Sequence, residues 1–117
     1  MRHNFLTMVT AKSELFTEKQ QQQAILFKAL AHPARLAILV YLAETKTCIS
    51  GDISNELPLS RTTVNQHLME LKKAGLIKGT ILGSKTNYCL NTCEIDKMGT
   101  MIQELLKNLS HGQPQEC

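Results

Sequence analysis

The chain lacks a hydrophobic stretch long enough to cross a membrane. Its 117 residues are 43% apolar, but no run of about 18 consecutive apolar residues occurs. The N-terminus, Met1 to Leu6, has no hydrophobic region of the kind that secretory signals contain. We therefore expect a globular cytoplasmic protein without a membrane partner, in which residues 1–117 form one domain.

The sequence motifs of common enzymes are missing as well. Cysteine and histidine occur without a triad-like arrangement, and there is no glycine-rich phosphate loop or metal-hydrolase motif. We therefore predict that the chain is not an enzyme and has no catalytic residues and no catalytic cofactor.

What the chain does contain is a polar helix that begins after Ser60, a residue type that favours the N-cap position. Val64, Leu68 and Leu71 recur at spacings of four and three, which places them on one buried face. The exposed face of the first two turns carries amides, hydroxyls and one arginine instead of the glutamates and lysines of an ordinary surface helix. Such side chains hydrogen-bond base edges in a major groove. This pattern indicates a helix that reads DNA; a merely solvated face is the alternative.

The segments on either side complete a winged helix-turn-helix. Pro58 cannot continue the helix expected from residue 51, so the chain must turn before the polar helix starts. Gly75 suits a left-handed C-cap, and residues 76–91 are typical of a hairpin with its tip at residues 82–85. The predicted fold is therefore mainly α with a small β-hairpin, with the helix-turn-helix at residues 51–74 and the wing at 76–91.

Positive charge gathers in this part of the chain, although the net charge is only +3. Between residues 60 and 87, one arginine and four lysines face a single acid, Glu70. This asymmetry suits a duplex whose phosphates supply affinity through counterion release; ordinary solubility charges are the alternative. The predicted DNA-binding residues are Ser60, Arg61, Thr62, Thr63, Asn65, Gln66, His67, Lys72, Lys73, Lys78 and Lys85.

These residues are expected to have different roles in DNA binding. Thr62, Thr63, Asn65 and Gln66 are the predicted base readers, Arg61 suits bases or phosphates, and the four lysines are predicted to contact phosphates. His67 is expected either to contact a phosphate or to pack inside the domain.

Helices are also predicted in the flanks, at residues 18–30 and 95–109, where apolar residues recur at helical spacing. The C-terminal stripe suits either its own domain or a second copy of the chain. Between the flanks, Pro33 fits the first position of a helix that is apolar almost all round and therefore central. Residues 1–17 are expected to form an N-terminal extension and residues 110–117 a flexible tail.

Two segments of the sequence, from Leu26 to Leu39 and from Leu59 to Leu68, resemble the ArsR/SmtB family of bacterial winged-helix repressors. The likeness extends over roughly residues 24–98. It implies a homodimer formed through the helices at 18–30 and 95–109, which releases double-stranded operator DNA when an inducer binds. No other protein partner is implied.

The four cysteines are the candidates for sensing that inducer. Without an export signal, they are expected to be thiols or metal ligands rather than structural disulfides. In winged-helix folds the strand before the second motif helix pairs with the returning wing strand, which would set Cys48 beside Cys89, with Cβ atoms about 5 Å apart. Both would point away from the core. Cys93 could add a third sulfur, while Cys117 falls in the tail; buried filler is the alternative role for a free cysteine.

A set of thiolates without histidine favours thiophilic ions. The resemblance points the same way, because arsenic-sensing members use two or three cysteines, whereas zinc sensors also rely on histidine and aspartate. We predict that Cys48, Cys89 and Cys93 bind trivalent arsenic, as arsenite or an organoarsenical, or trivalent antimony. Ser50 stands where some arsenic sensors carry the second cysteine of a Cys-x-Cys element.

Other readings of the chain stay open. A thiol-redox repressor would oxidise the same cysteines to a disulfide or persulfide, helped by a nearby cation such as Lys46 or Lys85. A zinc- or cadmium-responsive repressor of the same fold would coordinate its metal instead. A winged helix that binds only protein is a further alternative.

Overall fold

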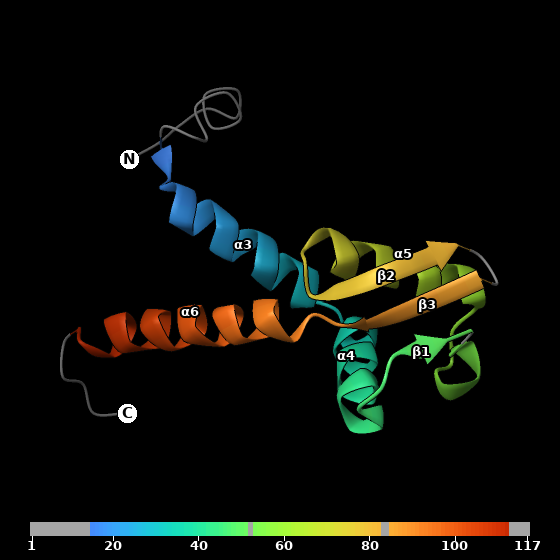
Figure 1. The fold of residues 1–117 in the computed structure, drawn as a ribbon. Coiled ribbons are helices and arrows are strands. Elements are labelled where there is room, and N and C mark those ends of the chain that lie inside the picture. Colours follow the sequence, from blue (N-terminus) through green and yellow to red (C-terminus); the bar gives the residue numbers. More distant parts are fainter. Residues whose placement is uncertain (1–14, 52, 83–84, 113–117) are drawn as a thin grey trace.

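The computed structural model describes residues 15–51, 53–82 and 85–112 (Figure 1). The elements are α3 (Glu18–Leu30), α4 (Pro33–Thr45), β1 (Ile49–Ser50), the 3-10 turn η1 (Ser54–Glu56), α5 (Arg61–Lys73), β2 (Ile77–Leu82), β3 (Lys85–Leu90) and α6 (Thr92–Ser110). Most of the extension predicted at residues 1–17, and most of the tail predicted at 110–117, lie outside the described residues.

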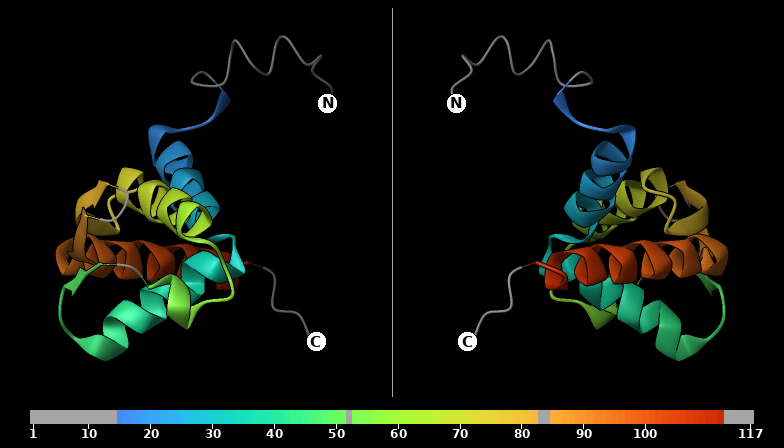
Figure 2. Two further views of the ribbon diagram at one scale, coloured as in Figure 1. Left: turned by 90° about the vertical axis from the view of Figure 1, so that its right-hand side faces the viewer. Right: turned by 90° about the vertical axis from the view of Figure 1, so that its left-hand side faces the viewer.

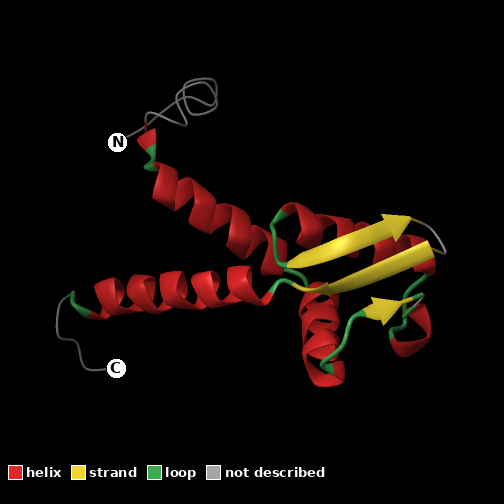
Figure 3. Ribbon diagram, in the orientation of Figure 1, coloured by secondary structure: helices red, strands yellow, loops and turns green. Residues whose placement is uncertain are grey.

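The described chain is mainly helical with one small antiparallel sheet (Figure 3). Its strand order is β1-β3-β2, so the first, short strand pairs with the returning strand of the hairpin. Helices α3 and α6 extend to the side opposite the hairpin tip (Figure 1), where Lys19 Nζ lies 3.6 Å from Glu104 Oε1. The predicted winged helix-turn-helix is therefore confirmed, as is the expected pairing of a short strand before the motif with the returning wing strand.

Helix starts follow the local signals in the sequence. His32 caps α4, since its Nδ1 accepts a hydrogen bond from the Ala34 backbone N–H at 3.0 Å, and Pro33 occupies the first turn. Ser60 caps α5 by accepting from the Thr63 backbone N–H at 3.2 Å. These caps satisfy N–H groups that no preceding turn can pair.

The end of α5 is equally well defined. Gly75 adopts a φ of 84°, and its N–H donates to the Lys72 carbonyl at 2.9 Å, while the Leu76 N–H donates to the Leu71 carbonyl at 3.0 Å. This pair of bonds is the Schellman arrangement, in which the left-handed position favours glycine. The predicted C-cap is confirmed, and the helix turns sharply into β2.

The first helix of the motif is much shorter than the sequence predicts. Only the 3-10 turn η1 forms where a helix was expected from residue 51, because Leu57 is already extended before Pro58 and Gly51 has a left-handed φ of 95°. Ser54 and Asn55 also favour turns over helix interiors. Ile53, just before η1, is buried in the core.

The core lies between α4, α5 and the inner face of the sheet. Its largest fully buried side chains are Tyr88, Ile38, Leu42, Leu68, Leu71, Leu76, Ile77 and Val64. Helix α4 is central through Ile38 and Leu42, as predicted, but Leu36 and Val40 on its other side are exposed. Within the described residues, only one side of the apolar surface of α4 is therefore buried.

Close strand pairing in the wing depends on Gly79. Its φ is 126°, and a Cβ atom there would collide with the Asn87 carbonyl oxygen and approach Tyr88 Cα to 2.8 Å. Leu82 pairs with Lys85 at the end of the hairpin, as predicted, and the connecting residues 83–84 lie outside the described residues. The register that follows places Lys78 directly opposite Cys89.

Helix α6 leaves the body of the domain after its first turns. Ile95 and Met98 pack against the core, whereas Leu106 and Leu109 are 58% and 67% exposed. Figures 1 and 2 together show the helix extending away from the sheet toward the C-terminus. Within the described residues, no single helix is long and apolar enough to cross a membrane; only α3 and α4 together, across an 85° bend, reach that composition.

Candidate nucleic-acid interface and cysteine pair

The predicted DNA-binding residues fall mainly on the exposed side of α5. The exposed ones are Ser60, Arg61, Thr62, Gln66, Lys72, Lys73 and Lys78, and the half-buried ones are Thr63 and Asn65. Lys85 is the first residue of β3, and its side chain lies outside the described part of the structure. The first two turns of α5 thus present a polar face, and the contacts of this face with DNA stay predictions.

Two of these hydroxyl side chains are already engaged at the start of α5. Ser60 Oγ accepts from the Thr63 N–H and donates to Thr63 Oγ1 at 3.0 Å. Ser60 and Thr63 therefore shape the start of the helix. Thr62 and Gln66 remain the exposed candidates for reading bases.

His67 occupies a different environment from the other predicted DNA-binding residues. It is only 9% exposed, its Nδ1 accepts a hydrogen bond from Arg35 Nε at 3.1 Å, and its ring lies 4.2 Å from that of His32. Burial lowers the pKa of His67, and the neighbouring His32 and Arg35 lower it further. Of the two roles predicted for His67, the structure supports packing.

Arg35 joins this cluster, which sequence reasoning did not single out. Besides His67, its guanidinium donates to the Ala29 carbonyl at 3.2 Å. It therefore holds the end of α3, the start of α4 and the middle of α5 together. No local sequence pattern predicts this contact, because Arg35 and His67 are 32 positions apart.

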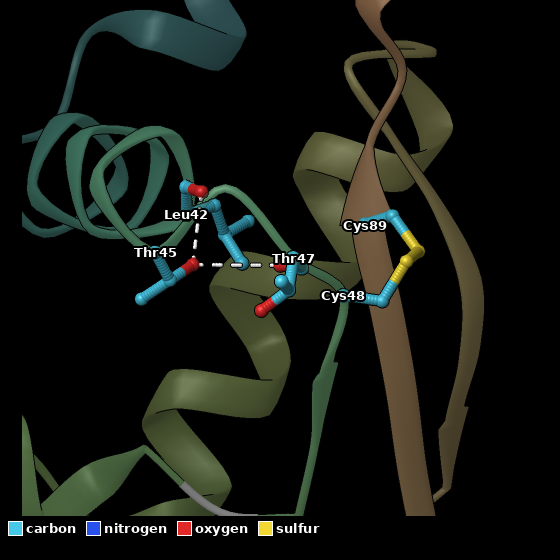
Figure 4. The surroundings of a disulfide bond; sticks show 5 residues. All are labelled: Leu42, Thr45, Thr47, Cys48 and Cys89. Carbon is cyan, nitrogen blue, oxygen red and sulfur yellow. Dashed lines mark hydrogen bonds between the residues drawn. A yellow bond between two sulfur atoms is a disulfide. The ribbon is translucent and has the colours of Figure 1, made fainter.

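The predicted neighbourhood of Cys48 and Cys89 is confirmed. Ile49 pairs with Tyr88, which places Cys48 directly opposite Cys89, and their Cα atoms are 4.3 Å apart. The two residues form a disulfide that bridges β3 and the segment leading into β1 (Figure 4). The structure therefore differs from the free thiols expected at these two positions, because cross-strand pairing brings the sulfurs within bonding reach.

The third predicted sulfur is not gathered with this pair. Cys93 is a free, exposed cysteine, and the described residues contain no group of three or more His, Cys, Asp or Glu side chains that could hold a metal ion. The physical reason is that α6 begins at Thr92, so Cys93 is carried on a helical turn instead of folding back onto the strand. The structure thus supplies a two-sulfur site.

A cation and a cavity adjoin the sulfur pair. Cys48, just before β1, Cys89 on β3 and Lys78 on β2 form a row across the sheet, on the face opposite to buried Ile77 and Tyr88. Beside this row is a cavity of about 500 Å³ whose lining includes Lys46 as well as Lys78 and both cysteines. The predicted hairpin tip already implied the pairing of residue 78 with residue 89, so the role of Lys78 beside the sulfurs was available from the sequence.

The sulfur pair is mechanically linked to the reading helix. Gly51 N–H donates to the Thr86 carbonyl at 2.9 Å, and Thr86 Oγ1 donates to the Gly51 carbonyl. The chain then continues through η1 into α5. The two cysteines are 41 positions apart, and the loop that their bond closes contains η1, α5 and β2. These elements are the helix-turn-helix and the first strand of the wing.

On the other side, the end of α4 is tied to the segment before Cys48. Thr45 Oγ1 donates to the Leu42 carbonyl at 3.0 Å and lies 3.4 Å from the Thr47 carbonyl (Figure 4). Any change at the cysteine pair therefore acts between a core helix and the wing.

Comparison with known protein families matches residues 32–78 to the family described as "Bacterial regulatory protein, arsR family". An uncharacterized HTH-type transcriptional regulator of Methanocaldococcus jannaschii is 34% identical over 88 residues, which are 75% of this chain and 99% of that protein. The transcriptional activator HlyU of Vibrio cholerae is 32% identical over 89 residues, or 75% of this chain and 82% of HlyU. The HTH-type transcriptional regulator CmtR of Mycobacterium tuberculosis is 33% identical over 89 residues, 75% of each chain.

Solved structures share the fold. An ArsR-like transcriptional regulator from Rhodococcus matches with a TM-score of 0.61 and 22% identity, over 78% of this chain and 85% of that one. The structure of HlyU from Vibrio cholerae matches with a TM-score of 0.57 and 28% identity, over 77% of this chain and 97% of that one. The sequence and structural likenesses therefore agree on one kind of protein.

Proposed function

The chain belongs to the arsR family of bacterial regulatory proteins and is a transcriptional regulator, and from this premise we propose that it is a homodimeric repressor controlled by the Cys48–Cys89 pair. In this proposal α5 and the wing bind operator DNA in the cytoplasm while the two cysteines are reduced. Oxidation of the pair to a disulfide releases the operator.

The observation that carries the proposal is the cross-strand position of two cysteines without a third sulfur beside them. Two thiols that face each other are oxidised by one peroxide, which takes two electrons and gives one disulfide and two waters. Cytoplasmic thiols are normally kept reduced, so a disulfide forms there only when an oxidant acts. The pair therefore suits a redox signal.

The fold supports coupling between this bond and DNA. Without the disulfide, the segment of β1 is held to β3 by two ladder pairs, Ile49 with Tyr88 and Ser50 with Asn87, and by the hydrogen bonds between Gly51 and Thr86. The reduced form then has freedom to adjust α5 against the wing on a duplex, whereas the oxidised form is fixed in one arrangement. If the reduced and oxidised forms differ in their free energy of DNA binding by about 1 to 3 kcal/mol, which is typical of allosteric coupling, oxidation suffices to release the operator.

Trivalent arsenic is the second candidate signal, and the two-sulfur geometry favours one form of it. A monosubstituted organoarsenical has two exchangeable positions and needs two thiolates, whereas arsenite has three positions to fill. A pair without Cys93 therefore suits the organoarsenical better than arsenite, antimonite or a zinc or cadmium ion, which take more ligands.

Operator binding of oxidised and reduced protein tests the proposal. Duplexes selected by the reduced protein from random DNA serve as operators, and binding is measured by fluorescence anisotropy in reductant and after peroxide treatment. We expect oxidation to weaken binding by about 5- to 150-fold. Cys48→Ser and Cys89→Ser should bind equally with and without peroxide, while the matched control Cys93→Ser should keep the response.

The same assay separates the candidate signals. Phenylarsine oxide, arsenite, antimonite, zinc and cadmium are each added to the reduced protein. Release by phenylarsine oxide with no effect of peroxide would replace the redox proposal by the organoarsenical one. Equal operator binding under all these conditions, in the wild type and both serine variants, would remove the cysteine pair from regulation.

A further inference from the structure

The cavity beside the Cys48–Cys89 bond has features that regulation by oxidation alone does not require. It measures about 500 Å³, which is within the range of small-molecule sites. Both sulfur-bearing residues line it, together with apolar Leu42 and Leu90. A small molecule that enters this cavity therefore contacts both residues of the disulfide.

The charged residues that line the cavity are all positive. Lys46, at the end of α4, and Lys78, on β2, both line it, and no acid is among the described residues that line it. In the described ranges 15–51, 53–82 and 85–112, neither lysine has an ion pair. Two cations in a cavity whose described lining contains no acid favour an anionic ligand.

From this arrangement we propose that the cavity binds low-molecular-weight thiols that carry a carboxylate, and that these thiols reduce the Cys48–Cys89 disulfide from within it. The inference rests on the proposed function, since it names the molecule that returns the oxidised regulator to its DNA-binding state. The carboxylate contacts the lysines, which holds the thiol next to the bond.

The exchange proceeds in two balanced steps. The thiolate of the ligand attacks the exposed Cys48 sulfur, a new S–S bond forms there, and the bond to Cys89 breaks with its electron pair leaving on the Cys89 sulfur. Lys78, directly opposite Cys89, stabilises the departing thiolate. A second ligand thiolate then attacks the sulfur of the ligand bound to Cys48, which releases a ligand disulfide and leaves two reduced cysteines.

Reduction rates of the oxidised full chain test this inference without DNA. The probes are 3-mercaptopropionate, which is anionic, 2-mercaptoethanol, which is neutral, and cysteamine, which is cationic. Rates are corrected for the thiolate fraction of each probe and for its rate with a small model disulfide. We expect 3-mercaptopropionate to react about tenfold faster than 2-mercaptoethanol at low ionic strength, with cysteamine slowest and the preference lost in high salt.

Variants locate the site. Lys46→Gln combined with Lys78→Gln should bring the three rates together, whereas Lys97→Gln combined with Lys107→Gln, on exposed positions of α6, should leave the anion preference intact. The Cys89→Ser variant is also treated with the disulfide form of 3-mercaptopropionate. Peptide mapping by mass spectrometry should then find 3-mercaptopropionate joined to Cys48 by a mixed disulfide. Equal corrected rates for all three thiols, or a preference that survives loss of both lysines, would overturn the inference.

The outcomes distinguish this inference from the proposed function. If peroxide produces no Cys48–Cys89 disulfide, the redox proposal fails and the exchange site fails with it. If the disulfide forms and releases the operator but shows no preference for anionic thiols, only the exchange site is wrong.

Discussion

At the scale of single residues, His67 shows how one buried side chain links helices. It accepts a hydrogen bond from Arg35, and its ring lies against that of His32 at an interplanar angle of 48°; all three residues lie where α3, α4 and α5 meet. Burial lowers its pKa below the usual value of 6.5, and the two neighbouring basic residues add to that effect. The folded chain therefore favours the neutral form of this imidazole more than the unfolded chain does.

Because of this shift, His67 should lower the free energy of unfolding as the pH falls. In the unfolded chain His67 gains its proton as the pH drops through about 6.5, whereas in the folded chain it does so only at lower pH. The unfolded state thus binds more protons in this window, and the free energy of unfolding decreases as the pH falls below 6.5. Denaturant unfolding at pH 7.5 and 5.5 measures the loss.

The variant His67→Gln provides the comparison, since its amide oxygen can accept from Arg35 but does not titrate. We expect the wild type to lose more stability than this variant between the two pH values. The matched control His111→Gln changes an exposed histidine after α6 and should behave as the wild type does. Parallel losses in the wild type and His67→Gln would contradict the assignment.

At the scale of elements, α5 combines two surfaces of opposite character. Val64, Leu68 and Leu71 are fully buried, while Gln66 and Lys72 are exposed on the same helix. The inner surface anchors the helix, so the outer one is free to vary without loss of the fold. This separation makes it possible to test reading and phosphate binding independently.

Substitutions on the outer surface should therefore have distinct effects on DNA. Gln66→Ala should weaken binding to a selected operator by about 1 to 3 kcal/mol and leave random DNA almost unchanged, because an amide discriminates between bases. Lys72→Ala should weaken binding to both kinds of DNA alike and reduce the slope of log K against log salt by about 1. Anisotropy titrations at several salt concentrations measure both quantities.

Alanine keeps or raises helix propensity at both positions, so circular dichroism of the two variants should match that of the wild type. If Gln66→Ala also weakened binding to random DNA in proportion, Gln66 would be a general contact instead of a base reader.

At the scale of the whole molecule, the distal half of α6 has little to pack against. No residue of α6 is fully buried, and its stripe ends in exposed Leu106 and Leu109. A stripe of this kind is the usual mark of an interface, and a second copy of the chain would cover it in the proposed dimer. A reader of palindromic DNA needs two such copies.

Charges on this stripe should therefore dissociate the dimer. The double variant Leu106→Glu and Leu109→Glu should sediment as a monomer at concentrations where the wild type is a dimer, and its operator affinity should fall. The control Gln103→Glu and Asn108→Glu adds the same charge at exposed polar positions of α6 and should stay dimeric. A monomeric wild type, or a dimeric leucine variant, would refute the role of α6.

Much of the reading unit could be predicted because its signals are local. Ser60, Gly75 and Pro58 act through caps, left-handed backbone and the missing N–H, which depend on immediate neighbours. The length of η1 was mispredicted because Gly51 and extended Leu57 leave too little chain between them for an α-helix, whatever the apolar spacing indicates.

The amino-acid sequence alone determined the order of the main helices and the register of the wing hairpin, since strand alternation and turn position follow from neighbouring residues. That Cys48 faces Cys89 was expected only from the strand pairing typical of winged-helix folds, because the two residues are 41 positions apart. Only the tertiary structure decided that these sulfurs bond as a pair apart from Cys93, that His67 is buried under Arg35, and that Lys46 and Lys78 share a cavity. Those outcomes depend on how elements distant in the chain pack in three dimensions, and local patterns carry no information about that.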